Sequence, residues 1–194
     1  MESLVLPHLP TTLHIALFTS VRNSAFLRAQ LLAGNKEFEY AFVDPETIFS
    51  RAHVLAACFR ALNDAAHSRG RCRNVHADIV YSLSMNSNVS FVFADWNRWD
   101  GELTTAQIAE SLRRFGIADG SKHVLVVKVS GHVEEVRRHL IGAVEGELVP
   151  FTDEKLAELR DPGRIRSLYR LAKMPGEGTD AEAQILAAMA LKGS

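Results

Sequence analysis

Cysteine, long apolar runs and an excess of either charge are all scarce in this sequence of 194 residues. The two cysteines, Cys58 and Cys72, are too few for a disulfide framework and lack the spacing of a zinc site. No apolar run approaches the roughly 18 residues of a membrane span, and the N-terminal stretch lacks the basic and apolar regions of a secretory signal. These absences predict a protein of a reducing compartment, the cytosol or the nucleus, without membrane contact.

The short motifs of the common enzyme classes are also missing. The sequence has no phosphate-binding glycine loop before a helix and no G-x-S-x-G, H-E-x-x-H or C-x-x-C. His132 and His139 share one face of a predicted helix, but solvent-facing or capping histidines explain this pattern without a metal. We therefore expect no metal, cofactor or catalytic residue. A small α/β enzyme using His or Asp chemistry is the alternative interpretation, although no nucleophile, base and orienting group can be recognised together.

Hydrophobic residues make up 47% of the chain, which is enough for one ordinary core. The chain of 194 residues is too short for two domains of ordinary size. Residues 1–194 are therefore expected to form a single domain. The formal net charge is −1, so any RNA contact would have to be a local basic patch.

Strand and helix patterns alternate along the chain. Alternating or continuous apolar residues predict strands at residues 12–21, 40–45, 76–84, 122–130 and 147–151. Apolar residues at steps of three and four predict helices at residues 25–33, 46–69, 108–115, 132–146 and 181–192, and two short helices within 153–171 that are broken at Asp161-Pro162-Gly163. The predicted fold is α+β, an α/β sandwich with a sheet of about four strands and helices on its faces. The patterns alone leave the pairing direction open.

Two features indicate binding. Basic residues cluster at Arg69, Arg71 and Arg73, at Arg113 and Arg114, and at Arg164, Arg166 and Arg170 beside Tyr169. Such clusters are either solvated faces or, with a nearby ring, contacts to a single-stranded RNA end. The last helix follows a Gly-rich linker and carries Ile185, Leu186, Met189 and Leu191, so it docks either on its own body or in a partner's groove.

Five segments stand out in order along the chain: "FVDPETI…HVLAACFRAL", "YSLSMNSN" joined to "IAESLRRFGI", "HVLVVKV", "VEGELVP" and "IRSLYRLAK". Together they resemble the small subunit of the EKC/KEOPS complex, the family that includes the human p53-related-protein-kinase-binding protein. The resemblance runs from about Thr12 to Ser194. It implies a central, largely antiparallel sheet flanked by helices on both faces.

The resemblance also implies a function. Members of this family are not enzymes. They bind the small kinase/ATPase subunit of the complex, whose own partner transfers threonylcarbamoyl to adenosine 37 of tRNA, and archaeal relatives bind the tRNA 3′ CCA end. The resemblance thus implies a regulatory subunit that binds the kinase directly, the other subunits indirectly and tRNA weakly. In fungi it further implies links to telomere maintenance and transcription, and a location in nucleus and cytoplasm.

Site residues follow from the same resemblance. A C-terminal docking helix at about residues 180–192, with Ile185, Leu186 and Met189, is similar to the family's kinase-binding surface. Replacing Ile185 and Met189 by Asp is expected to abolish kinase binding and leave a folded monomer. The residues expected to contact tRNA or a partner are Asn86, Asn88, Arg113 and Arg114.

One stretch interrupts the family pattern. Removing residues 89–107 joins "MNSN" to "IAESLRRFGI" with nothing missing on either side. Val89-Ser90 is compatible with the codons that start an intron and Gln107 with those that end one, so we interpret the insert as a retained intron translated in frame. The alternative is a functional loop, because Phe91, Phe93, Trp96 and Trp99 would form an exposed aromatic patch. With the insert present, Thr104 and Gln107 are expected to form a capping box for the following helix.

Overall fold

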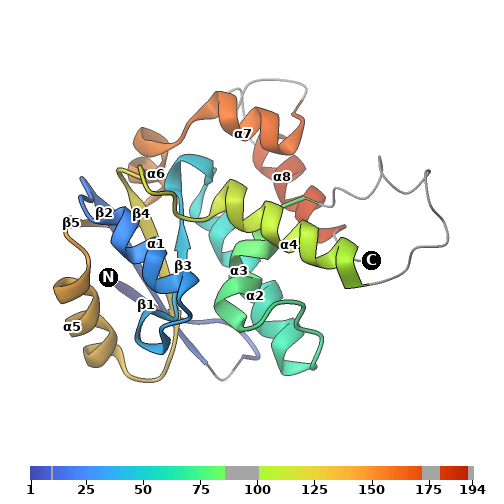
Figure 1. Ribbon diagram of the computed structural model, residues 1–194. Helices are drawn as coiled ribbons and strands as arrows, with labels where there is room; N and C mark the ends of the chain where they lie inside the picture. Colours follow the sequence, from blue (N-terminus) through green and yellow to red (C-terminus); the bar gives the residue numbers. More distant parts are fainter. Residues whose placement is uncertain (10, 86–100, 172–179, 192–194) are drawn as a thin grey trace.

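A single antiparallel sheet with helices on both faces forms the centre of the molecule (Figure 1). This computed structural model describes residues 1–9, 11–85, 101–171 and 180–191. The strands are β1 (Glu2–Val5), β2 (Thr12–Thr19), β3 (Ala41–Val43), β4 (Val124–Val129) and β5 (Glu147–Val149). Their order is β1-β2-β4-β3, and β5 pairs with the far end of β2. The predicted α+β fold is confirmed, and every pairing among the described strands is antiparallel.

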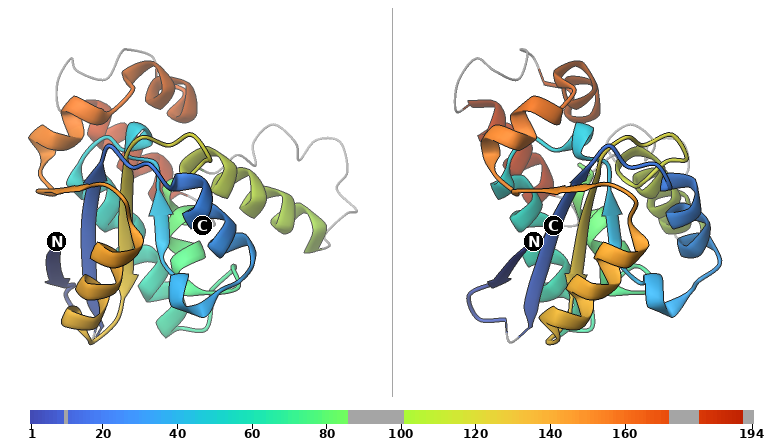
Figure 2. Two further views of the ribbon diagram at one scale, coloured as in Figure 1. Left: turned by 60° about the vertical axis from the view of Figure 1, so that its left-hand side comes forward. Right: turned by 90° about the vertical axis from the view of Figure 1, so that its left-hand side faces the viewer.

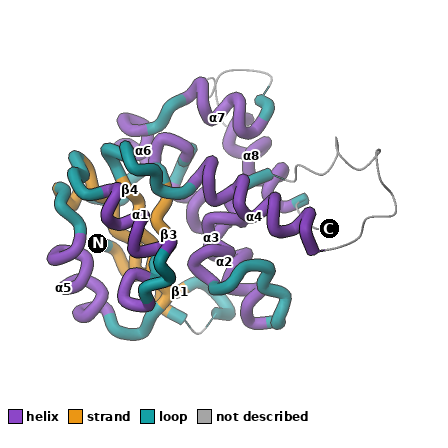
Figure 3. The backbone as a smooth tube through the Cα atoms, in the orientation of Figure 1, coloured by secondary structure: helices purple, strands orange, loops and turns teal. Residues whose placement is uncertain are grey.

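Helices cover the two faces of the sheet unequally (Figures 2 and 3). The helices of the described residues are α1 (Ser24–Leu32), α2 (Arg51–Ala66), α3 (Val75–Leu83), α4 (Gly101–Phe115), α5 (Val133–Ala143), α6 (Asp153–Leu159), α7 (Pro162–Tyr169) and α8 (Asp180–Ala190), with 3-10 turns at Lys36–Phe38 and Pro45–Thr47. Buried side chains of α1 and α5 pack on one face, while those of α2, α3, α6, α7 and α8 pack on the other.

The central strand β4 contributes to both cores. Its side chains alternate between the faces, so that Leu125 and Val127 join the larger cluster while Val124 and Val126 join the smaller one. All four are fully buried. The strand predicted at residues 122–130 is therefore confirmed and is covered on both faces, and the sheet separates two hydrophobic cores.

The segment predicted as a strand at residues 76–84 is the helix α3, so that prediction was wrong. Asn74 caps the helix, because its side-chain oxygen accepts a hydrogen bond from the backbone N–H of Ala77 at 2.8 Å. Seven of the nine residues of α3 are buried. A helix buried on nearly all sides has apolar residues all round, which hides the helical period and looks like the continuous run of a strand.

The helix predicted to start near residue 46 is split in two. Asp44 caps only the 3-10 turn at Pro45–Thr47, through the N–H of Glu46. The buried Ile48 is extended, and α2 then starts afresh with Ser50, whose hydroxyl accepts from the N–H of His53 at 3.2 Å.

Helix α4 begins before the predicted helix. It starts at Gly101, so residues 101–107 of the expected insert form its first half. Thr104 therefore lies inside the helix, and its predicted role as a cap was wrong. Figure 1 shows α4 beside α3, with its first turns reaching away from the sheet. The rest of the insert, with its aromatic residues, and the linker at 172–179 lie outside the described residues.

Several other elements match their predicted positions. α5, β5 and the two short helices α6 and α7 all lie within the predicted ranges, and Pro162 lies in the first turn of α7. The strand β1 was not predicted. Among the described helices, none combines the length and the apolar character that crossing a membrane requires.

Candidate functional site

Helix α8 packs against α2 of its own chain. Ile185 is fully buried and Met189 is 3% exposed, both within the larger core, and Leu186 is partly buried beside them. The expectation that Asp at positions 185 and 189 leaves a folded monomer is therefore corrected, because each substitution would place a carboxylate in this core. Ala183 and Ala187, on the outer face of α8, are exposed and open to a partner.

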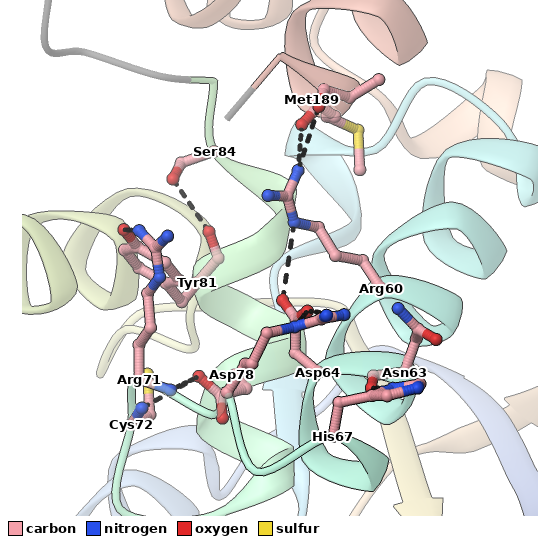
Figure 4. A network of polar contacts seen from close by, with 12 residues as sticks. Arg60, Asn63, Asp64, His67, Arg71, Cys72, Asp78, Tyr81, Ser84 and Met189 are labelled. Atoms are coloured by element: carbon pink, nitrogen blue, oxygen red, sulfur yellow. Dashed lines mark hydrogen bonds and ion pairs between the residues drawn. The ribbon is translucent and has the colours of Figure 1, made fainter. Parts of the chain in front are cut away.

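Polar contacts hold both ends of α8. Near its start, the hydroxyl of Ser50 donates to the carboxylate of Glu182. At its end, the guanidinium of Arg60 donates to the carbonyl oxygen of Met189 at 2.6 Å (Figure 4). Cations favour the C-terminal end of a helix, where backbone carbonyls lack partners. Arg60 therefore acts as a cap supplied by a neighbouring helix.

An open groove with a volume of about 660 Å³ lies between α2 and α8, and we call it the α2–α8 groove. Its lining is half apolar and half polar: Ala56, Phe59, Leu186, Met189 and Ala190, with Arg60, Asn63, Asp64, Arg69 and Arg71. Of the predicted basic clusters, the one at residues 69–73 is thus the one that meets the predicted docking helix. Neither Phe59 nor Arg60 was predicted as a site residue from the sequence. The exposure of Phe59, 45% of its surface, marks it as a candidate contact and is visible only in the structure.

The turn at residues 69–73, which we call the arginine-bearing turn, has a fixed backbone. Buried Asp78, on α3, accepts hydrogen bonds from the N–H groups of Arg71 and Cys72 at 3.1 and 2.9 Å with one carboxylate oxygen (Figure 4). A side chain at Gly70 would come within 3.0 Å of the other oxygen. The turn therefore presents its arginines from a backbone tied to α3.

The two arginines predicted for tRNA or partner contact lie on the last turn of α4. The side chains of Arg113 and Arg114 are 72% and 44% exposed, and both pair with Glu110. Ser84, at the end of α3, bonds to Ser111 of α4 at 2.8 Å. This contact joins the end of α3 to the helix that carries the two arginines. Asn86 and Asn88 themselves lie outside the described residues.

The buried histidine His53 belongs to an internal network. Its Nδ1 accepts from the N–H of Phe49 at 3.2 Å, so its Nε2 carries the proton and donates to the hydroxyl of Tyr169 at 2.7 Å. That hydroxyl in turn donates to the carbonyl oxygen of Leu83. Burial lowers the pKa of His53 to about 3 and raises that of Tyr169 well above its ordinary value. With no exposed surface and both nitrogens engaged, His53 joins α2, α3 and α7 and has no access to a substrate.

Other candidates for chemistry have structural partners too. His139, on α5, shares a hydrogen bond of 2.7 Å between its Nδ1 and the hydroxyl of Tyr40, and the two rings stack. Across the described part of the chain, no three His, Cys, Asp or Glu side chains gather in a way that would hold a metal ion.

A groove that combines apolar side chains with arginines on a rigid α+β scaffold is typical of a protein that binds another macromolecule. The fold and the groove define a domain of this class. Comparison with known proteins then gives the family: the sequence model described as "Kinase binding protein CGI-121" matches residues 18–97 and 103–193. The chain belongs to this family.

Fungal relatives match along their whole length. A protein of Aspergillus fumigatus named "EKC/KEOPS complex subunit cgi121" is 42% identical over 203 residues, which cover 100% of this chain and 97% of the relative. The Aspergillus terreus protein of the same name is 40% identical over 210 residues, with the same coverage of both chains. The Schizosaccharomyces pombe protein of that name is 30% identical over 193 residues, covering 98% of this chain and 99% of the relative. The resemblance seen in the sequence is thereby confirmed.

The family match is interrupted within the expected insert. Residues 98–102 lie between the two matched segments, whereas the insert predicted from sequence spans residues 89–107. The interruption falls within that range, and the family model matches the parts of it at residues 89–97 and 103–107.

Proposed function

We propose that this protein is a non-catalytic regulatory subunit of the EKC/KEOPS complex. It binds the kinase/ATPase subunit and helps to recruit tRNA for threonylcarbamoyladenosine formation at position 37. The observation that carries the proposal is the match to fungal subunits of this complex over the whole chain, at up to 42% identity among those compared. The internal use of His53, His139 and Asp78 supports a binding role, since each of these groups already bonds within the fold.

Co-expression with the kinase/ATPase subunit tests this proposal. We expect a stable 1:1 complex and stimulated ATPase activity of the kinase subunit. Absence of a complex, or turnover of a substrate by this protein alone, would instead favour the small-enzyme alternative.

Because Ile185 and Met189 are buried, the proposed kinase-docking surface is the outer face of α8, with the exposed Ala183 and Ala187. Ala187→Arg adds a long charged side chain on that face without touching the core. We expect it to prevent co-purification with the kinase subunit. Ala29→Arg, at an exposed position of α1 against the opposite face of the sheet, is the matched control and should co-purify normally. Normal co-purification of the Ala187→Arg variant would exclude this face of α8.

Arg113 and Arg114 are the proposed tRNA contacts. Exposed ion pairs such as those with Glu110 contribute little energy, so these arginines remain available to phosphates. Replacing both by Glu should weaken tRNA binding by about tenfold or more and flatten its dependence on salt. The exposed pair Arg137 and Arg138 on α5, replaced in the same way, is the control with equal charge change. Equal effects of the two pairs would refute a local site.

Two further proposals, on cellular location and on the origin of residues 89–107, rest on the resemblance to this family. We propose a location in nucleus and cytoplasm with a role in telomere maintenance and transcription, which fluorescent tagging and telomere-length measurement in a deletion strain would test. We also propose that residues 89–107 arise from a retained intron. Every valine codon begins with GT, so the informative codon is that of Gln107: CAA instead of CAG there would remove the AG and disprove the intron. Transcript sequencing across this stretch would show whether it is spliced.

A further inference from the structure

We propose that the α2–α8 groove binds a segment of the kinase subunit that combines carboxylate side chains with an apolar anchor. This inference rests on the proposed function and adds the chemistry of the bound segment. The observation that carries it is that apolar side chains and arginines line the same groove. They come from parts of the chain more than a hundred residues apart.

The apolar half of the groove is suited to an apolar side chain. Phe59 projects from α2 with 45% of its surface exposed, opposite Leu186 and Met189 of α8. Leu191, directly after the lining residue Ala190, is 66% exposed. Large apolar side chains gathered around a groove mark a contact site, because their burial by a partner removes apolar surface from water.

The charged half of the groove is suited to carboxylates. Three arginines and one aspartate line it, which leaves an excess of two positive charges. Asp64 is shared, lying 3.9 Å from Arg60 and 3.1 Å from Arg69. Arg71 is exposed, and its guanidinium lies 3.4 Å from the hydroxyl of Tyr81. Arginine pairs with carboxylates through two parallel hydrogen bonds, so a partner's acidic side chain would offset the excess charge.

Binding to this groove requires little ordering of the protein. Asp78 already fixes the backbone of the arginine-bearing turn, and Arg60 already holds the end of α8. A site whose walls are set in advance loses less conformational freedom when it binds.

The lining favours a protein segment over a nucleic acid. Four of its ten residues are aliphatic, namely Ala56, Leu186, Met189 and Ala190, which suit apolar side chains. A groove that follows a phosphate backbone would instead carry a row of cations with exposed rings between them. Here two of the three arginines share one internal aspartate, and the groove has a single aromatic residue, Phe59.

Calorimetric titration of the full-length protein with the kinase subunit tests the proposal. The double variant Arg69→Glu/Arg71→Glu should bind at least about tenfold more weakly, since it sets like charges against the partner's carboxylates. Its affinity should also depend less on salt between low and moderate ionic strength. The control Arg137→Glu/Arg138→Glu makes the same charge change on α5 and should stay within about twofold of the wild type.

The apolar half is tested with a second matched pair. Phe59→Ala should weaken kinase binding severalfold. Phe26→Ala, at a phenylalanine of nearly equal exposure (47%) on α1, should not. Thermal unfolding of each variant shows whether the fold is retained. If the Arg69→Glu/Arg71→Glu variant has lost its fold, the milder Arg71→Gln replaces it.

Three results would overturn the inference. Wild-type affinity in both groove variants would exclude this groove while leaving the kinase complex itself intact. Loss of tRNA binding with kinase binding unchanged would make the groove a nucleic-acid site. Failure of the wild-type protein to bind the kinase subunit would remove the proposed function, and this inference with it.

Discussion

Removing the buried hydroxyl of Tyr169 with Tyr169→Phe gives a sharp test of the structure. The hydroxyl serves two buried partners, the Nε2–H of His53 and the carbonyl oxygen of Leu83. Tyr169 is 4% exposed and His53 is fully buried, so water cannot readily take the place of the lost oxygen. The substitution keeps the ring and leaves one donor and one acceptor without a partner.

The expected loss of stability follows from those two groups. A buried polar group without a partner costs about 1–3 kcal/mol, so the free energy of unfolding should fall by about 3 kcal/mol. For a domain of this size, that corresponds to a decrease in Tm of roughly 6–12 °C. Urea unfolding followed by circular dichroism measures the free energy, and differential scanning calorimetry measures the Tm.

Tyr40→Phe is the matched control. Its hydroxyl also bonds to a histidine, His139, but that ring is only half-buried and can turn to water. We expect a loss of at most about 1 kcal/mol. Equal losses in the two variants, or a loss below about 1 kcal/mol for Tyr169→Phe, would refute the buried network.

Three further predictions concern pH, a backbone contact and a helix cap. His53 and His76 each have a pKa lowered to about 3 by burial, so both favour the folded state when neutral; this stability is complete above about pH 6.5 and lost as the pH falls towards 3. Unfolding midpoints between pH 7.5 and 4 should fall steeply, and an unchanged midpoint would contradict the burial of both rings. Gly116→Ala should lower the free energy of unfolding by about 2 kcal/mol or more, because the new Cβ would lie 2.4 Å from the carbonyl oxygen of Leu112. The control Gly142→Ala, whose Cβ would lie in open space on α5, should be neutral or stabilise the fold by up to about 1 kcal/mol. Arg60→Met should reduce stability by about 1 kcal/mol and speed hydrogen exchange in α8, and unchanged exchange there would show that the arginine does not hold the helix.

Local sequence patterns predicted those elements that carry a strong local signal, such as an apolar run of strand length, the end of a helix or a turn motif. β2 and β4 show the apolar character of central strands, α4 ends at Phe115 as predicted, and Asp161-Pro162-Gly163 separates two short helices. These features depend on neighbours within a few residues, which is what a sequence pattern records.

Features that depend on tertiary contact were missed. α3 looks like a strand because the rest of the fold surrounds it, and β1 was not predicted because it is only four residues long with alternating partial burial. The α2–α8 groove could not be foreseen, since it forms where Arg60 meets an element 129 residues further along the chain. For the same reason, the sequence could not tell which residues of α8 face the core and which face outward.

The pairing of β2 with β4 sets a constraint on synthesis. Residues 13–18 lie beside residues 124–129, so more than a hundred residues must leave the ribosome before the centre of the sheet can close. Until then, the apolar side chains of β2 have only β1 as a strand partner, and contacts so distant in sequence form slowly. The nascent chain therefore passes through a long interval in which this apolar strand is incompletely covered, and during that interval we expect it to depend on chaperones.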